Sequence, residues 1–358
     1  MQMMSNIFCH DLSPPFAKRL ESKVAIVTGG ASGFGECTVR LFTKHGAKVV
    51  IADVQDERGI SLCEELLSKY GNVMYVHCDV TNDLDVKNVV DTTVSKYGKL
   101  DIMFNNAGIS GDTNNTILSS SVENFKHVFN VNVFGSLLGA KHAARVMIPA
   151  RSGVILFTSS VSSVIACGVS HAYSASKHSI IGLMKNLCVE LGEYGIRVNS
   201  ISPCAIATPL MVNAMGMEKK IVEELVCESA VLKGAVPTAE DVAEAAVYLA
   251  SDEGKFVSGL NLVIDGGYSA TNQSFARVVN SFFSSDDACL YLPLSVFSED
   301  AAARDAQGKC SAGNVVRREE PLLDVLWGYN LHDDAHQDSP LYCGCWLNSL
   351  GCSMGVEM

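Results

Sequence analysis

Tyr173 and Lys177 stand four positions apart in a helical stretch, which places both side chains on one helix face. A tyrosine phenol has a pKa of about 10, so it is a poor base near neutral pH. A nearby cation favours the phenolate, and so does the positive ring of an oxidised nicotinamide. Such a phenolate takes the proton of an alcohol while hydride leaves the same carbon. The same spacing is also common on ordinary helix surfaces, so this reading depends on its surroundings.

Two polar residues upstream are candidates to complete this site. Ser160 follows an apolar run, 154–158, and its hydroxyl is in a position to bond the substrate oxygen. Asn132 falls in a helical stretch predicted over 122–148. Its amide either has no special partner or bends the helix and holds a water behind Lys177 in a proton relay.

A glycine-rich turn joins a predicted strand, 24–27, to a predicted helix, 33–45. This order places backbone N–H groups at a helix N-terminus, where a pyrophosphate binds. The spacing differs from the common G-x-G-x-x-G pattern, so an ordinary strand-to-helix turn is the alternative. The residues predicted here to contact a dinucleotide are Gly29, Ser32, Gly33, Phe34 and Gly35.

The ends of the next strands favour the same cofactor. Asp53, followed by Val54, ends a strand at 49–52, where a carboxylate accepts the adenosine ribose hydroxyls and repels a 2′-phosphate. The turn at 28–35 has no Arg or Lys to attract that phosphate, so NAD is expected rather than NADP. Further along, either Asp79 bonds the adenine amino group beside Val80, or Thr81 or Asn82 simply caps a helix.

The bulk properties of the 358-residue chain exclude some functions. Hydrophobic residues make up 48%, enough for a large core, and the net charge of −12 argues against nucleic-acid binding. The 13 cysteines form no C-x-x-C pair, which predicts free thiols in a reducing compartment and no metal site. We expect neither a secretory signal nor a membrane span, and hence a cytoplasmic protein.

Short apolar runs alternate with longer amphipathic stretches between residues 21 and 280. This pattern predicts an α/β fold with a doubly wound parallel sheet covered by helices on both faces. Residues 1–20 form an N-terminal extension in this interpretation, and residues 281–358 form a poorly ordered tail or a small accessory subdomain. Predicted strands lie at 24–27, 49–52, 73–77, 100–104, 154–158, 197–201 and 262–264.

These motifs together resemble those of the short-chain dehydrogenase/reductase family. The resemblance covers residues from about 21 to 270 of this chain. The matching residues are TGGASGFG at 28–35, Asp53, NNAG at 105–108, Asn132, Ser160, Tyr173, Lys177, NSISP at 199–203 and DGG at 265–267. The resemblance implies a seven-stranded Rossmann-type sheet, an Asn-Ser-Tyr-Lys tetrad and a homotetramer. It also implies cofactor contacts from Asn106, Ala107, Gly108, Lys177, Pro203, Ile206 and Thr208.

Further segments, such as HCDVT and LGEYGIRVNSISP, resemble the plant group that includes secoisolariciresinol dehydrogenase, xanthoxin dehydrogenase and momilactone A synthase. This resemblance implies NAD-dependent oxidation of a secondary alcohol or lactol on a hydrophobic cyclic metabolite, such as a lignan, a terpenoid or an abscisic-acid precursor. Cys204 departs from the family, which commonly has glycine there. The alternatives are a catalytically silent nucleotide-binding regulatory protein and an NADPH-dependent ketone reductase.

The substrate is expected under a lid formed by residues of about 205–235. Apolar side chains suited to its lining are Val164, Leu210, Met211 and Met215, beside the hydroxyls of Ser160 and Tyr173. They alternatively pack on the underside of the lid itself. No Arg or Lys lies between Val198 and Met217, which disfavours an anionic substrate and favours a small hydrophobic alcohol.

Overall fold

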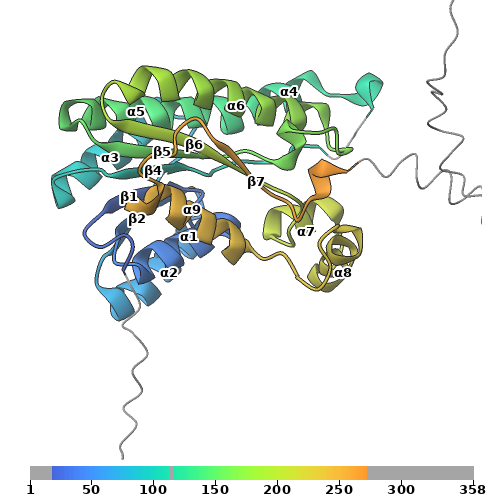
Figure 1. The fold of residues 1–358 in the computed structure, drawn as a ribbon, viewed down its shortest axis with the longest axis horizontal. Coiled ribbons are helices and arrows are strands. Elements are labelled where there is room, and N and C mark those ends of the chain that lie inside the picture. The colour runs from blue at the N-terminus through green and yellow to red at the C-terminus, as the bar shows by residue number, and fades with distance from the viewer. Residues whose placement is uncertain (1–17, 113–115, 272–358) are drawn as a thin grey trace, which may run out of the picture. The chain divides into compact units, whose positions relative to one another are not determined.

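The structure is a computed structural model that describes residues 18–112 and 116–271. Seven strands in these residues form one sheet in the order β3-β2-β1-β4-β5-β6-β7, and all neighbours are parallel (Figure 1). The predicted parallel seven-stranded sheet is confirmed. The strands are β1 (Val24–Thr28), β2 (Lys48–Asp53), β3 (Val73–His77), β4 (Ile102–Asn105), β5 (Gly153–Thr158), β6 (Ile196–Pro203) and β7 (Asn261–Ile264).

Helices cover both faces of this sheet (Figure 1). One face carries α1 (Gly33–Lys44), α2 (Asp56–Tyr70) and α9 (Ala239–Ala250), and the other carries α3 (Asp83–Tyr97), α4 (Val122–Phe129), α5 (Gly135–Ala150) and α6 (His171–Gly192). The predicted lid contains α7 (Pro209–Met215) and α8 (Lys219–Ser229). Short 3-10 turns are η1 (Ile117–Ser119), η3 (Val161–Ser163), η4 (Asp252–Gly254) and η5 (Tyr268–Ala270).

The apolar runs of the sequence produce this layering. Successive strand residues point to opposite faces, so Ile26 packs in the core under α3, α5 and α6 while Val27 packs in the core under α1, α2 and α9. A strand covered on both sides must therefore be apolar at every position. All five residues of β1 are buried, as this argument requires.

The strand order reverses between β1 and β4, which pair with each other in the centre of the sheet. Such a reversal opens a crevice at the carboxyl ends of the strands, and ligands of doubly wound folds bind there. The predicted site residues on the ends of β1, β2, β4, β5 and β6 thus share one edge of the sheet. The predicted N-terminal extension, up to residue 17, and the predicted tail at 281–358 lie outside the described residues.

The single helix predicted over 122–148 is wrong in two respects. A π-helical turn, η2 (Asn130–Phe134), separates α4 from α5. Pro149 does not end the helix but lies in its last turn, and Arg151 ends it with a left-handed φ of 51°. Residue periodicity does not reveal the π turn, because its cause is a contact of Asn132 with a distant backbone segment.

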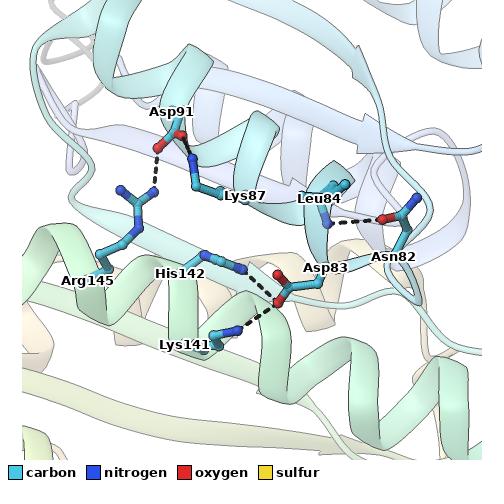
Figure 2. A network of polar contacts seen from close by, with 8 residues as sticks. All are labelled: Asn82, Asp83, Leu84, Lys87, Asp91, Lys141, His142 and Arg145. Carbon is cyan, nitrogen blue, oxygen red and sulfur yellow. Dashed lines mark hydrogen bonds and ion pairs between the residues drawn. The ribbon is translucent and has the colours of Figure 1, made fainter.

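Ion pairs join α3 to α5 on one side of this layer (Figure 2). Asp83 accepts from Lys141 Nζ at 2.7 Å and faces His142 Nε2 at 3.1 Å, while Asp91 pairs with Lys87 and Arg145. Hydrogen bonding to Lys141 lowers the pKa of Asp83. These contacts stabilise the position of α5, which continues directly from the π turn.

We predict opposite effects of adding one methyl group to two helix glycines. A Cβ at Gly139 would lie 1.8 Å from Oδ1 of the buried Asn105, whereas a Cβ at Gly182 would meet no atom within 4 Å. Gly139→Ala should lower the free energy of unfolding by about 1–3 kcal/mol through overpacking of α5 against β4. Gly182→Ala should raise it by up to about 1 kcal/mol through helix propensity. Urea denaturation of both variants measures this, and equal effects would contradict the packing of α5.

Candidate active site

The glycine-rich turn brings the start of α1 directly over the end of β1. Gly29 has a left-handed φ of 62°, and a Cβ on Gly35 would lie 2.0 Å from the Gly29 carbonyl oxygen. Only glycine permits this approach. The side chain of Ser32 makes no capping hydrogen bond to the helix. The first-turn N–H groups of α1, which include those of Phe34 and Gly35, therefore form an end of a helix suited to a pyrophosphate.

Asp53 is fixed against this turn at the end of β2. Its carboxylate, 5% exposed, accepts hydrogen bonds from the Ala31 N–H at 2.9 Å and from the Gln55 N–H at 2.9 Å. Val54 beside it is exposed. The structure thus brings a buried negative charge to the place where the sequence argument put the adenosine ribose.

The segment after β3 makes local hydrogen bonds that shape a turn and cap a helix. Asp79 accepts hydrogen bonds from both the N–H and the hydroxyl of Thr81, at 2.9 Å and 2.8 Å, so it shapes the turn. Asn82 caps α3 through the Leu84 N–H at 3.0 Å. Val80 is buried against Gly135, where an added Cβ would lie 2.8 Å from its side chain.

Asn106, which follows β4, forms side-chain hydrogen bonds to the ends of β1 and β5. Its amide nitrogen donates to the Thr28 carbonyl at 3.0 Å, and its amide oxygen accepts from the Thr158 hydroxyl at 3.0 Å. The Thr28 hydroxyl accepts from the N–H groups of Asn106 and Ala107. The sequence analysis missed Thr28 and Thr158 as positioning residues, although each is a hydroxyl residue that ends an apolar strand, and that was the available signal.

Lys177, Tyr173 and Ser160 meet at the end of β5. Lys177 is 4% exposed, its Nζ donates to the Thr158 carbonyl at 2.8 Å, and it lies 5.5 Å from the centroid of the Tyr173 ring. The Ser160 side chain lies near enough to the Tyr173 hydroxyl to counter part of the rise in the phenol pKa. A Cβ on Gly108 would lie 3.6 Å from Lys177 Nζ, so the backbone there closes one side of this group.

Burial shifts the pKa values of both titratable groups. It lowers the pKa of Lys177 to about 8, because no carboxylate among the described residues pairs with the ammonium. Burial also raises the pKa of Tyr173, and this outweighs the opposing hydrogen bond from Ser160. The expected lowering of the phenol pKa is thus absent in the protein alone, because desolvation exceeds the effect of its polar neighbours.

The Asn132 amide has specific hydrogen-bond partners, so the alternative in which it has no special partner is wrong. Its Oδ1 accepts from the Ile109 N–H at 2.8 Å, and its Nδ2 donates to the Ile109 carbonyl and to the Ser176 hydroxyl, each at 3.0 Å. The side chain is 1% exposed. It lies in the π turn, a feature that is frequent at functional sites. Ser176, between Tyr173 and Lys177 in the chain, is a further residue that sequence reasoning missed.

The residues after β6 lead into the segment predicted to form the lid. Pro203 ends the strand, Ile206 is buried, and Thr208 begins α7 3.7 Å from the position of a Cβ on Gly33. The start of the lid therefore lies beside the glycine turn. Burial raises the pKa of Cys204, which keeps its thiol protonated near neutral pH.

A cavity of about 530 Å³ lies between α7 and the segment that follows β4. Of the apolar residues predicted to contact substrate, Leu210 lines it, whereas Val164, Met211 and Met215 do not. Val164 is exposed, and the two methionines are partly buried. The lining residues are Ser110, Gly111, Asp112, Ser119, Leu210, Asn213 and Ala214.

Three negative findings apply to residues 18–112 and 116–271. All seven cysteines in these ranges are free thiols. No cluster of His, Cys, Asp and Glu side chains there is suited to a metal ion. None of the helices there combines the length and apolar character that a membrane span needs.

Comparison with known proteins gives a family and close relatives. Residues 29–269 match the family model described as enoyl-(acyl carrier protein) reductase. Short chain aldehyde dehydrogenase 1 of Euphorbia lathyris is 60% identical over 276 residues, which cover 75% of this chain and 96% of that protein. Secoisolariciresinol dehydrogenase of Forsythia intermedia is 56% identical, with 72% of this chain and 92% of that protein covered.

A solved structure shares the same fold. The 3-ketoacyl-(acyl-carrier-protein) reductase from Brucella melitensis, complexed with NADH, matches with a TM-score of 0.64 and 33% identity. The match covers 70% of this chain and 99% of that one.

We predict that the buried Lys177 makes stability depend on pH in an unusual direction. Its pKa of about 8 in the folded protein lies below the ordinary lysine value of 10.5, so the folded protein without cofactor loses this proton at a lower pH than the unfolded chain does. Stability is then reduced below pH 8 and recovers as pH rises from 8 to 10.5, by about 3 kcal/mol at full extent. Lys177→Met should remove this rise.

Urea denaturation of both proteins between pH 7 and pH 10 measures the effect. The stability of Lys177→Met relative to the parent protein should fall across this range, whatever constant offset the lost bond to Thr158 adds. A difference that stays constant with pH would show that Lys177 is not desolvated in the folded state.

Proposed function

The chain belongs to the short-chain dehydrogenase/reductase family, as its motifs indicated, and on that premise we propose that it oxidises a hydrophobic secondary alcohol with NAD. Its oxidoreductase family and its similarity to the plant secoisolariciresinol dehydrogenase group are established by the comparisons. The proposal adds the direction, the cofactor, the substrate class and the role of each residue.

The neighbouring hydroxyls of Ser160 and Tyr173 would bind the alcohol oxygen. The bound oxidised dinucleotide supplies the hydride acceptor. Tyr173, as a phenolate stabilised by the nearby ammonium of Lys177, accepts the hydroxyl proton as hydride leaves the carbinol carbon, and becomes a neutral phenol. Asn132 holds Ile109, and hence the backbone beside Gly108, in place behind the ammonium group.

One observation carries this proposal. The ammonium of Lys177 lies at once 5.5 Å from the Tyr173 ring, 2.8 Å from the Thr158 carbonyl, and beside Gly108. Thr158 in turn bonds Asn106, which bonds the glycine turn. The proton acceptor, the cation and the floor of the cofactor crevice are therefore joined by direct contacts.

The preference for NAD is supported by Asp53. Its two hydrogen bonds fix the carboxylate beside the turn, where a 2′-phosphate would meet a negative charge of low solvent exposure. The lining of the cavity includes no Arg or Lys, which supports an uncharged alcohol. The name of the Forsythia intermedia relative, secoisolariciresinol dehydrogenase, supports the direction of oxidation.

We further propose a homotetramer in the cytoplasm and a catalytic domain at residues 21–280 that ends before a tail at 281–358. Exposed apolar side chains along α4, η2, α5 and α6 support self-association: Phe125, Phe134, Leu137 and Val189. The family match at residues 29–269 supports the proposed extent of the domain.

Tyr173→Phe should reduce turnover of a cyclic secondary alcohol by about 10³-fold, because general base catalysis is lost. The dissociation constant for NAD should change less than about 3-fold, since no binding charge is removed. Tyr194→Phe, at a partly buried position beyond the C-terminal end of α6, is the matched control. Turnover of Tyr173→Phe near the parental rate would refute the assigned base. A parent protein that binds NAD but oxidises no alcohol of a broad panel would favour the regulatory alternative.

The parent protein should bind NAD about 100-fold more tightly than NADP, a difference of about 2.8 kcal/mol. Asp53→Ser should narrow this ratio to within about 10-fold, because it removes the repelling charge. Glu57→Gln, an exposed acid in the first turn of α2, controls for a general change of charge. Fluorescence titration with both dinucleotides measures the ratios. A preference of the parent protein for NADPH would support the ketone reductase alternative.

A further inference from the structure

The cavity between α7 and the segment after β4 is more polar than an apolar alcohol needs. Beside Leu210, its walls present the hydroxyls of Ser110 and Ser119, the carboxylate of Asp112 and the amide of Asn213. A pocket for a hydrocarbon ring alone has no use for four hydrogen-bonding side chains, since each loses water when the ligand enters.

This cavity is joined to the catalytic residues by the backbone of residues 108–112. Gly108 lies against Lys177 and Asn132, and four residues of extended chain span at most about 14 Å, so Asp112 is within that distance of Gly108. The Ser170 hydroxyl bonds the Ser110 carbonyl at 3.3 Å and accepts the Tyr173 N–H at 3.3 Å.

A second, small cavity of about 10 Å³ continues in the same direction. It shares Asp112 and Ser119 with the first cavity and extends to Ser170, His171 and Ala172, directly before Tyr173 in α6. The lining of this second cavity thus ends at Ala172, one residue before Tyr173 in the chain.

Asp112 is the group best suited to a donor on the ligand. Its backbone N–H donates to Asn124 Oδ1 at 3.2 Å, which fixes its position. Its carboxylate is exposed and, among the described residues, forms no ion pair or hydrogen bond. A carboxylate oxygen accepts from a hydroxyl more strongly than a neutral acceptor does.

We propose that this cavity recognises a second hydroxyl group, carried by the alcohol substrate at the end remote from its reacting carbinol. Asp112 accepts the hydrogen bond from this hydroxyl, and Asn213 on α7 binds its oxygen. The inference rests on the proposed function, in which the carbinol reacts at Tyr173. It narrows the substrate class from hydrophobic alcohols in general to elongated ring compounds with a polar group at each end.

Two probe alcohols that differ by one hydroxyl test this inference. They are 4-phenylcyclohexanol and 4-(4-hydroxyphenyl)cyclohexanol, whose phenol is not a carbinol and is not oxidised to a ketone. The full-length protein should show about 10-fold higher kcat/KM with the second probe, mainly through KM, since the extra bond is made before and during reaction. Calorimetric binding of both probes gives a readout that needs no turnover.

Asp112→Ala and Asn213→Ala should each reduce the ratio of kcat/KM between the two probes from about 10-fold to less than about 2-fold. Glu64→Ala, an exposed acid on α2, is the matched control and should keep the preference. Equal kcat/KM and equal affinity for the two probes in the parent protein would overturn the inference while leaving the proposed oxidation intact. So would a preference that survives in both variants. Absence of oxidation with every alcohol would instead overturn the proposed function, and the binding comparison would then still decide whether the second hydroxyl is recognised.

Discussion

The Lys177 ammonium group is buried with no carboxylate partner in the part of the chain that the structure describes, and the site depends on this constraint. An unpaired buried charge is costly, and the backbone carbonyl of Thr158 offsets only part of that cost. The pKa of Lys177 falls to about 8 as a result. The surroundings that enforce this burial, Gly108 and the π turn around Asn132, also define the crevice next to Tyr173. A folded protein retains such an unfavourable burial of charge where catalysis needs a cation that is shielded from water.

Much of the fold was predictable, because its signals are local. Val24–Val27 is apolar at each position and leads into glycines, which together specify a buried parallel strand and a tight turn. The motif residues Asp53, Asn106, Ser160, Tyr173 and Lys177 end strands or share a helix face, so their meeting at one edge follows from the topology of a parallel sheet.

The remainder of the site depends on contacts between segments far apart in the chain. The π turn arises where Asn132 takes both backbone groups of Ile109, and nothing in the spacing around Asn132 indicates this. The raised pKa of Tyr173 likewise depends on how deeply its hydroxyl is desolvated, which is a property of the assembled site. The apolar substrate lining was inferred from residue type alone; of its members Leu210 lines the cavity beside α7, which Asp112 and Asn213 also line.

The closeness of Thr208 to Gly33 has a consequence for kinetics. Thr208 is the residue from which α7 starts, and α7 supplies one wall of the cavity for the alcohol. A dinucleotide seated on the glycine turn would therefore brace that wall from behind. An alcohol arriving first would meet a less firmly held wall than one arriving second. This contact, which touches neither reacting atom, would thus favour binding of the dinucleotide before the alcohol.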